Sequence, residues 1–164
     1  MSPIPLETKF KVLCEITRAQ HFAWRQSAAE SCPDVDAEKV TYRMWEITGH
    51  ETAKAYLKRL DPEQPLPLQI AKSMVWSSES MGESAVVEAG KDDSEAYVIH
   101  SDCPWFHWHK RLGLLKEDQP GCDLWFGTCI EDINKTLGTN VKIETLCSLP
   151  EGGDCCRRRI WVEK

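Results

Sequence analysis

The stretch VIHSDCPWFHWHKRLGL, residues Val98–Leu114, decides the fold. It opens with apolar, β-branched residues of the kind that favour a strand. Pro104 follows, and proline is favoured in the first turn of a helix. Gly113 is a residue type that commonly ends one. The stretch therefore predicts a strand that runs almost directly into a short helix.

The chain before this junction is predicted to be helical. Apolar residues recur at helical spacing over residues 6 to about 30, about 36 to 60, and about 68 to 81. The segment SCPDVDAEK separates the first two helices, where Asp34 or Asp36 can cap the second. Three prolines in LDPEQPLPL separate the second from the third.

Two β-hairpins complete the prediction. The runs SAVVEA and EAYVIHS flank the turn residues GKDDS, and VKIETLCSL and CCRRRIWVE flank PEGGD. A helix from Cys122 to Gly138 lies between the hairpins. Because hairpins pair strands antiparallel, the expected class is α+β, with N-terminal helices packed on an antiparallel sheet of two β-hairpins. We expect one domain over residues 1–164, helical to about 82 and mixed from about 83.

Composition narrows the function classes. The net charge of −6 disfavours nucleic-acid binding, which needs a basic face. No window approaches the ~18 apolar residues of a membrane helix, so we expect no membrane partner. The N-terminal residues mix charges into every turn and lack the apolar core of a signal peptide. The expected location is therefore cytoplasmic.

Eight cysteines are more than packing requires. In a cytoplasmic chain we expect them to be reduced. None forms a C-x-x-C pair, which removes support for zinc-ribbon and thioredoxin-like sites. The seven tryptophans have two interpretations, a Trp-rich core or an aromatic-walled pocket.

Cys103 and His107 are the first candidate site. Cys103 precedes the helix that Pro104 begins, where the helix dipole lowers a thiol pKa. His107 lies one turn further on the same face. The pair is a candidate nucleophile and base, or two ligands of one metal. The structural alternative is a buried cysteine beside a hydrogen-bonded histidine.

Two further groups are candidates. Cys122 and Cys129 lie on one face of the following helix, and Asp132 lies at the margin of that face. These residues either chelate a metal or form an apolar stripe that packs in the core. In the last strand, alternation places Cys156 and Arg158 on one side and Arg157 and Arg159 on the other. Arg157 and Arg159 are candidates for binding a substrate carboxylate, or they form a solvated face.

The ordered motifs DCPW at Asp102–Trp105, Gly113, CIED at Cys129–Asp132 and TLCSLPEGGDCC at Thr145–Cys156 resemble the L-2-amino-thiazoline-4-carboxylic acid hydrolase-like family. The helical first half, with HFAW at His21–Trp24, is similar in character. The chain is also distantly similar to four-vinyl-reductase-type ligand-binding domains. The resemblance implies hydrolytic opening of a small ring to a carbamoyl-cysteine, and it carries over Cys103, Cys129, Asp132 and Cys156.

The working hypothesis is a hydrolase acting on a C–N bond of a small heterocyclic or amidine-like substrate such as 2-amino-thiazoline-4-carboxylate. Either Cys103 attacks the C=N carbon with His107 as base, or a divalent metal, zinc or iron, activates water. Asp132 then orients water or a ligand. The metal ligands would be Cys103, Cys129 and Cys156; the substrate-binding residues would be Trp105, Trp108, Trp125, Arg157 and Arg159.

The alternative is a non-catalytic sensor domain that binds a metal or small ligand through cysteines. Such a domain would fill every coordination position of a bound metal with protein ligands, whereas a catalytic site keeps one open. A homodimer is an open expectation for either function.

Overall fold

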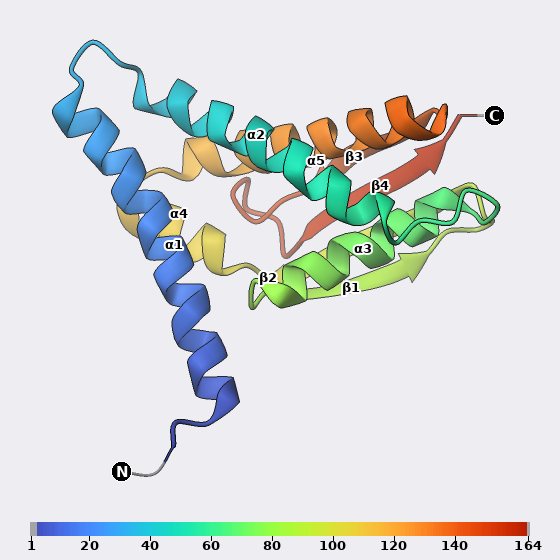
Figure 1. The fold of residues 1–164 in the computed structure, drawn as a ribbon, viewed down its shortest axis with the longest axis horizontal. Helices are drawn as coiled ribbons and strands as arrows, with labels where there is room; N and C mark the ends of the chain where they lie inside the picture. Colours follow the sequence, from blue (N-terminus) through green and yellow to red (C-terminus); the bar gives the residue numbers. More distant parts are fainter. Residues whose placement is uncertain (1–2, 164) are drawn as a thin grey trace. The chain divides into compact units, whose positions relative to one another are not determined.

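The computed structural model describes residues 3–163, which divide into two compact units between Thr41 and Tyr42. The elements in chain order are α1 Leu6–Ser31, α2 Ala37–Leu57, α3 Leu66–Ser80, β1 Ser84–Ala89, β2 Glu95–Asp102, α4 Pro104–Leu112, α5 Leu115–Leu137, β3 Val141–Cys147 and β4 Cys156–Val162 (Figure 1). The order of helices, hairpin, helices and hairpin confirms the predicted α+β class.

The first unit contains α1 and the start of α2. The backbone N–H of Cys32 closes the last turn of α1 by donating to the carbonyl oxygen of Ala28 at 3.2 Å. Asp36 then caps α2: its Oδ1 accepts from the backbone N–H groups of Glu38 at 3.1 Å and Lys39 at 3.3 Å. One of the two predicted capping residues is thereby confirmed.

The second unit is built on one antiparallel sheet with strand order β1-β2-β4-β3. The central strands β2 and β4 join the two hairpins, with Val98 opposite Arg158 and His100 opposite Cys156. Both strands alternate, so these four side chains lie on the buried face. Helix α3 runs along β1 and β2, and α5 runs along β3 (Figure 1).

A continuous apolar core fills the space between this sheet face and the helices of the second unit. Its most deeply buried large side chains are Tyr56, Ile70, Met74, Val98, Ile133 and Ile160. Within residues 3–163, no helix is both long enough and apolar enough to cross a membrane.

The ends of α4 and the start of α5 position residues that line a cavity. Pro104 begins α4, and Gly113 ends it in the left-handed region at φ 71°, both as predicted. Helix α5 begins at Leu115, well before the predicted Cys122, so Pro120 lies inside it. Pro120 is past the first turn of α5, so it removes the hydrogen bond that residue 120 would otherwise donate four residues back, and the packing of the helix offsets this loss. The earlier start places Asp118 and Cys122 one turn apart on one helix.

Two glycines allow α2 and α5 to approach closely. A Cβ added at Gly49 of α2 would lie 2.8 Å from the carbonyl oxygen of Trp125 and 2.9 Å from Cβ of Thr128. A Cβ at Gly121 of α5 would lie 2.9 Å from the Trp45 ring. Gly49 and Gly121 thus lie at points of close packing between the two helices.

We expect Gly49→Ala to lower the free energy of unfolding by about 1–3 kcal/mol, because the added methyl group overlaps α5 backbone. Gly127→Ala is the matched control, since an added Cβ there meets no heavy atom within 4 Å. Alanine favours a helix interior, so the control is expected to be stabilised by about 1 kcal/mol. Urea unfolding monitored by circular dichroism measures both; equal stability of the two variants would contradict the packing role.

Candidate active site

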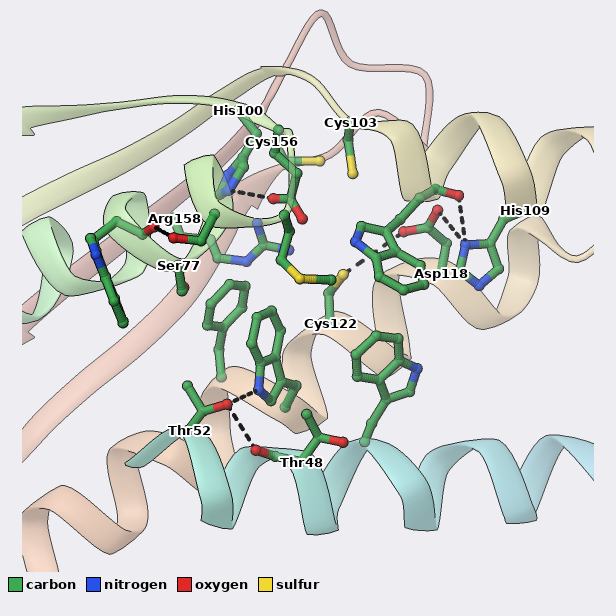
Figure 2. Close-up of a pocket in the computed structure, with 18 residues that line it drawn as sticks. Thr48, Thr52, Ser77, His100, Cys103, His109, Asp118, Cys122, Cys156 and Arg158 are labelled. Atoms are coloured by element: carbon green, nitrogen blue, oxygen red, sulfur yellow. Dashed lines mark hydrogen bonds and ion pairs between the residues drawn. The ribbon is translucent and has the colours of Figure 1, made fainter. Parts of the chain in front are cut away.

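A cavity of about 280 Å³ lies within the second unit, among α2, α3, α5, the start of α4 and the central strands. Its walls are mostly apolar, and the polar side chains come from several elements: His100 and Arg158 from the central strands, His109 and Asp118 from α4 and α5, and Thr48 and Thr52 from α2 (Figure 2). The lining residues are Trp45, Thr48, Thr52, Trp76, Ser77, Ser80, Met81, Glu83, His100, Cys103, Trp105, His109, Asp118, Cys122, Trp125, Phe126, Cys156 and Arg158. The volume is close to the lower end of the ~300–1,000 Å³ range of small-molecule sites.

Aromatic rings give the cavity a rigid wall. Trp45 packs edge-on against Trp105 with centroids 5.5 Å apart, and it lies 5.8 Å from Trp125. Trp125 stacks on Phe126 at 4.6 Å and donates from Nε1 to Oγ1 of Thr52 at 3.0 Å. These contacts hold flat apolar surfaces in fixed positions, as a planar ligand requires.

Arg158 is a buried cation with no counterion in the described part of the chain. Its side chain reaches the cavity from β4, and the residue is 3% exposed. The guanidinium lies 4.8 Å from the Phe126 ring centroid. Among residues 3–163, its Nε and Nη2 have no hydrogen-bond partner and no carboxylate pairs with it. Because an unpaired buried charge is costly, the cavity favours an anionic ligand group at this position.

Two carboxyl–imidazole pairs are buried beside the cavity. His100 Nε2 lies 2.8 Å from Oγ of Ser78 and 3.4 Å from Oε2 of Glu83, while its buried Nδ1 has no hydrogen-bond partner within the described chain. His109 Nδ1 lies 3.1 Å from Oδ2 of Asp118 and 3.0 Å from the carbonyl oxygen of Trp105. Partners of this kind fix the orientation of an imidazole ring.

Three thiols turn toward the same space, those of Cys103, Cys122 and Cys156 (Figure 2). Burial, and then the charge of Glu83, raise the pKa of Cys103 to about 12, while backbone N–H groups at the start of α4 lower it less. Burial also raises the pKa of Cys122 and of Cys156. The expectation that the helix dipole lowers the pKa of Cys103 is therefore wrong: loss of hydration outweighs the dipole.

The structure does not bring the predicted base to Cys103. His107 is largely exposed, and its Nε2 lies 2.6 Å from Oδ1 of Asp102. Asp132 is also outside the cavity lining, where its Oδ2 lies 2.6 Å from Nδ1 of His50 on α2. Neither side chain contacts the cavity that Cys103 lines.

The three predicted metal ligands are divided between two environments. Cys103 and Cys156 line the cavity, whereas Cys129 is fully buried in the apolar core. Residues 3–163 contain no group of three or more His, Cys, Asp or Glu side chains placed to hold a metal ion. The predicted three-thiolate site is thus not assembled in this fold.

The predicted substrate-binding residues are also divided. Trp105 and Trp125 line the cavity. Trp108 instead stacks against Arg111, whose guanidinium carbon is 3.7 Å from the ring centroid. Because side chains alternate along β4, Arg157 and Arg159 lie on the opposite face of the sheet. There Arg157 pairs with Glu88 at 2.6 Å, and Arg159 pairs with Glu95 at 2.9 Å.

Several cavity residues were not predicted from the sequence. One had a usable signal: Arg158 shares the period-two face of Cys156 and Ile160, which predicts a buried arginine. The others come together only through tertiary packing. They are Glu83 before β1, His100 on β2, His109 on α4, and Asp118 on α5.

An α+β domain with an aromatic-walled cavity and several polar side chains has the architecture in which small-molecule sites are commonly found. The family model for L-2-amino-thiazoline-4-carboxylic acid hydrolase matches residues 14–160, so the chain belongs to that family. The resemblance that the sequence motifs indicated is thereby confirmed. None of the curated proteins matches this sequence.

Among the similar solved structures, one with a TM-score of 0.59 supports the fold alone. A trafficking protein particle complex subunit 3 from Naegleria fowleri, covalently bound to palmitic acid, matches with a TM-score of 0.59 and 13% identity, over 94% of this chain and 97% of that one. An H-NOX protein from S. oneidensis in the Fe(II)NO ligation state matches with a TM-score of 0.48 and 11% identity, over 85% of this chain and 72% of that one.

Replacing the unpaired cation tests whether it is retained for a reason other than stability. We expect Arg158→Met to raise the free energy of unfolding by about 1–3 kcal/mol, because it removes a buried charge and keeps a long apolar side chain. Arg157→Met, on the exposed side of the same strand, is the matched control and should change stability little. Thermal and urea unfolding measure both; a marked loss in Arg158→Met would assign the guanidinium a structural role.

Proposed function

We propose that this protein hydrolyses a small cyclic amidine that carries a carboxylate, with 2-amino-thiazoline-4-carboxylate, the compound in the family's name, as the first candidate. Family membership supports the reaction class. The observation that carries the proposal is the unpaired, buried guanidinium of Arg158 in the same cavity as the carboxyl groups of Glu83 and Asp118.

Opposite charges in one cavity suit a zwitterion. An amidine is basic and is cationic near neutral pH, so this substrate carries an amidinium at one end and a carboxylate at the other. The guanidinium of Arg158 is suited to receive the carboxylate through two parallel hydrogen bonds. The carboxyl groups of Glu83 and Asp118 are suited to the amidinium. The rings of Trp45, Trp105 and Trp125 would then enclose the flat heterocycle.

Hydrolysis needs a base that activates water. We assign this role to His100, whose Nε2 is held by Ser78 and Glu83 while its Nδ1 has no partner in the described chain. Such an arrangement keeps the proton on Nε2 and leaves Nδ1 to accept one from water. The glutamate stabilises the imidazolium that forms. In this role His100 replaces His107 of the sequence hypothesis.

The reaction balances without a further reagent. Water oxygen bonds to the amidine carbon, the C=N bond becomes single, and the water proton passes to His100. The tetrahedral intermediate then collapses: its hydroxyl oxygen forms the C=O bond and loses its proton to bulk water, and the ring bond from that carbon to nitrogen or sulfur breaks. Protonated His100 gives its proton to the departing heteroatom. The product is a carbamoyl-cysteine, in which the ring atom that left is an amine or a thiol.

The cysteines have a supporting role in this proposal. With a pKa of about 12, Cys103 is a neutral thiol at neutral pH and a poor nucleophile without an adjacent base. We therefore assign Cys103, Cys122 and Cys156 to shaping the wall of the cavity. A bound zinc or iron remains a prediction, which elemental analysis of the purified protein tests.

The rival function is binding without turnover. The fold resembles that of a trafficking complex subunit that carries covalent palmitate, and the cavity wall is largely apolar. A non-catalytic sensor would bind the carboxylate compound with heat release in calorimetry yet form no product. An acyl-carrying protein would instead show an added acyl mass on a cysteine.

The first prediction separates recognition from chemistry. With 2-amino-thiazoline-4-carboxylate, we expect Arg158→Met to raise KM by about 10- to 150-fold, the value of a lost charged hydrogen-bond pair. With 2-amino-thiazoline, which lacks the carboxylate, the variant and the wild type should be similar. Product is followed by mass spectrometry. Arg159→Met, on the other sheet face, is the matched control and should behave as the wild type with both compounds.

The second prediction separates the two candidate bases. We expect His100→Gln to lower kcat by about 10²- to 10⁴-fold, because the proton acceptor is removed from the cavity. His107→Gln should leave kcat unchanged, since that ring lies against Asp102 at the surface. The reverse result, with His107 essential and His100 dispensable, would restore the sequence hypothesis. Absence of product with wild-type protein would reject the hydrolase function itself.

A further inference from the structure

A second pair of thiols lies outside the cavity lining, where the β3–β4 turn begins and ends. Cys147 is the last residue of β3, and Cys155 immediately precedes β4. Their Sγ atoms are 3.6 Å apart, and Cys147 Sγ lies 3.3 Å from the carbonyl oxygen of Cys155. Both residues are half-buried, so small reagents can reach them.

The turn between them keeps the two thiols together. The backbone N–H of Gly153 donates to Ser148 at 2.9 Å, and that of Gly152 donates to Leu149 at 3.1 Å. Gly152 has a φ of 89°, which favours glycine. A strand irregularity between Thr145 and Cys147 shifts the register at this end of the hairpin. The pairing of the strands and the turn thus hold the sulfur atoms in contact before any bond forms.

The neighbouring Cys156 is separated from this pair by strand geometry. Successive side chains of a strand point to opposite faces, so Cys156 turns to the cavity and accepts a hydrogen bond on Sγ from Leu149 N–H at 3.3 Å. Adjacent cysteines also bridge only with strained backbone. Of the three thiols in this region, Cys147 and Cys155 are therefore the two that can pair.

We propose that Cys147 and Cys155 form a redox-active dithiol that a low-molecular-weight disulfide, such as glutathione disulfide, oxidises to an intramolecular disulfide. One thiolate attacks the reagent and forms a mixed disulfide, releasing one reduced thiol. The second cysteine attacks the sulfur of the first cysteine in this mixed disulfide, which forms the S–S bond of the protein and releases the second reduced thiol. Two electrons and two protons pass to the reagent, and one S–S bond forms in the protein. This inference does not depend on the proposed hydrolase function.

The contact distance makes the second step fast relative to the first. A disulfide needs its sulfur atoms about 2.05 Å apart, and from 3.6 Å this requires only a small adjustment of the two side chains. Burial and the adjacent Cys147 raise the pKa of Cys155, which slows the first attack. Exchange is therefore best measured near pH 8.5, about the ordinary pKa of a thiol.

The test equilibrates the full chain with glutathione buffers of increasing oxidised fraction, alkylates the remaining thiols and measures intact mass. Of its eight thiols, wild type should lose Cys147 and Cys155 together to an internal disulfide and carry no glutathione on either of them. Cys147→Ser and Cys155→Ser, each with seven thiols, should form no intramolecular disulfide and should instead lose one thiol to glutathione on the remaining partner. Cys32→Ser, which removes an exposed cysteine of the first unit, is the matched control and should still lose two thiols.

Two outcomes would overturn the proposal: a stable glutathione adduct on Cys147 or Cys155 of the wild type, or an intramolecular disulfide that survives Cys147→Ser. Cys156→Ser should still form the disulfide, and its failure to do so in a folded protein would assign the bond to Cys156. Circular dichroism establishes that each variant is folded. Binding of one phenylarsine oxide per wild-type chain, lost in both single variants, provides a second measurement that needs no oxidation.

Discussion

The antiparallel pairing of β2 with β4 is the constraint on which the rest of the second unit depends. It joins two local hairpins into one sheet and sets the register that places Val98 opposite Arg158 and His100 opposite Cys156. A shift of one residue would send both site side chains to the solvent face. Val98 and Ile160 lie on the same strands as His100 and Arg158 and are fully buried. Their burial fixes the register that directs His100 and Arg158 into the cavity.

Loss of hydration explains most of the chemistry of the cavity. It raises the pKa of Cys103 and of Cys122. The Arg158 guanidinium also loses its hydration, and no counterion in the described chain compensates for that loss. Glu83 and Asp118 are buried with histidines beside them. A region of low polarity strengthens each remaining electrostatic interaction, so one well-placed anionic group on a ligand gains more here than at the surface.

The elements of the fold could be predicted because their signals are local. Pro104 and Gly113 mark both ends of α4, Asp36 caps α2, and turn residues mark both hairpins. The start of α5 was harder to predict from the sequence. Pro120 interrupts the helical pattern there, yet packing extends the helix to Leu115.

The site could be predicted only in part, since it depends on which faces meet. Cys103, Cys156, Trp105 and Trp125 were found from residue type and position. Spacing alone gave Cys103 a partner in His107, but that ring turns to the surface and lies against Asp102. The buried face of β4 carries Arg158, and an arginine between two core residues is a stronger signal of a site than the exposed arginines beside it.

Because Arg158 is unpaired within the described residues, the thermal stability of the folded protein should report the binding of its ligand. A compound that neutralises the guanidinium without leaving a gap against the indole walls would be bound by the native chain and not by the unfolded one, so it would raise the melting temperature. Ranking a panel of small carboxylic acids by that rise, with Arg158→Met as the blank, would point to the natural ligand before any reaction is assayed.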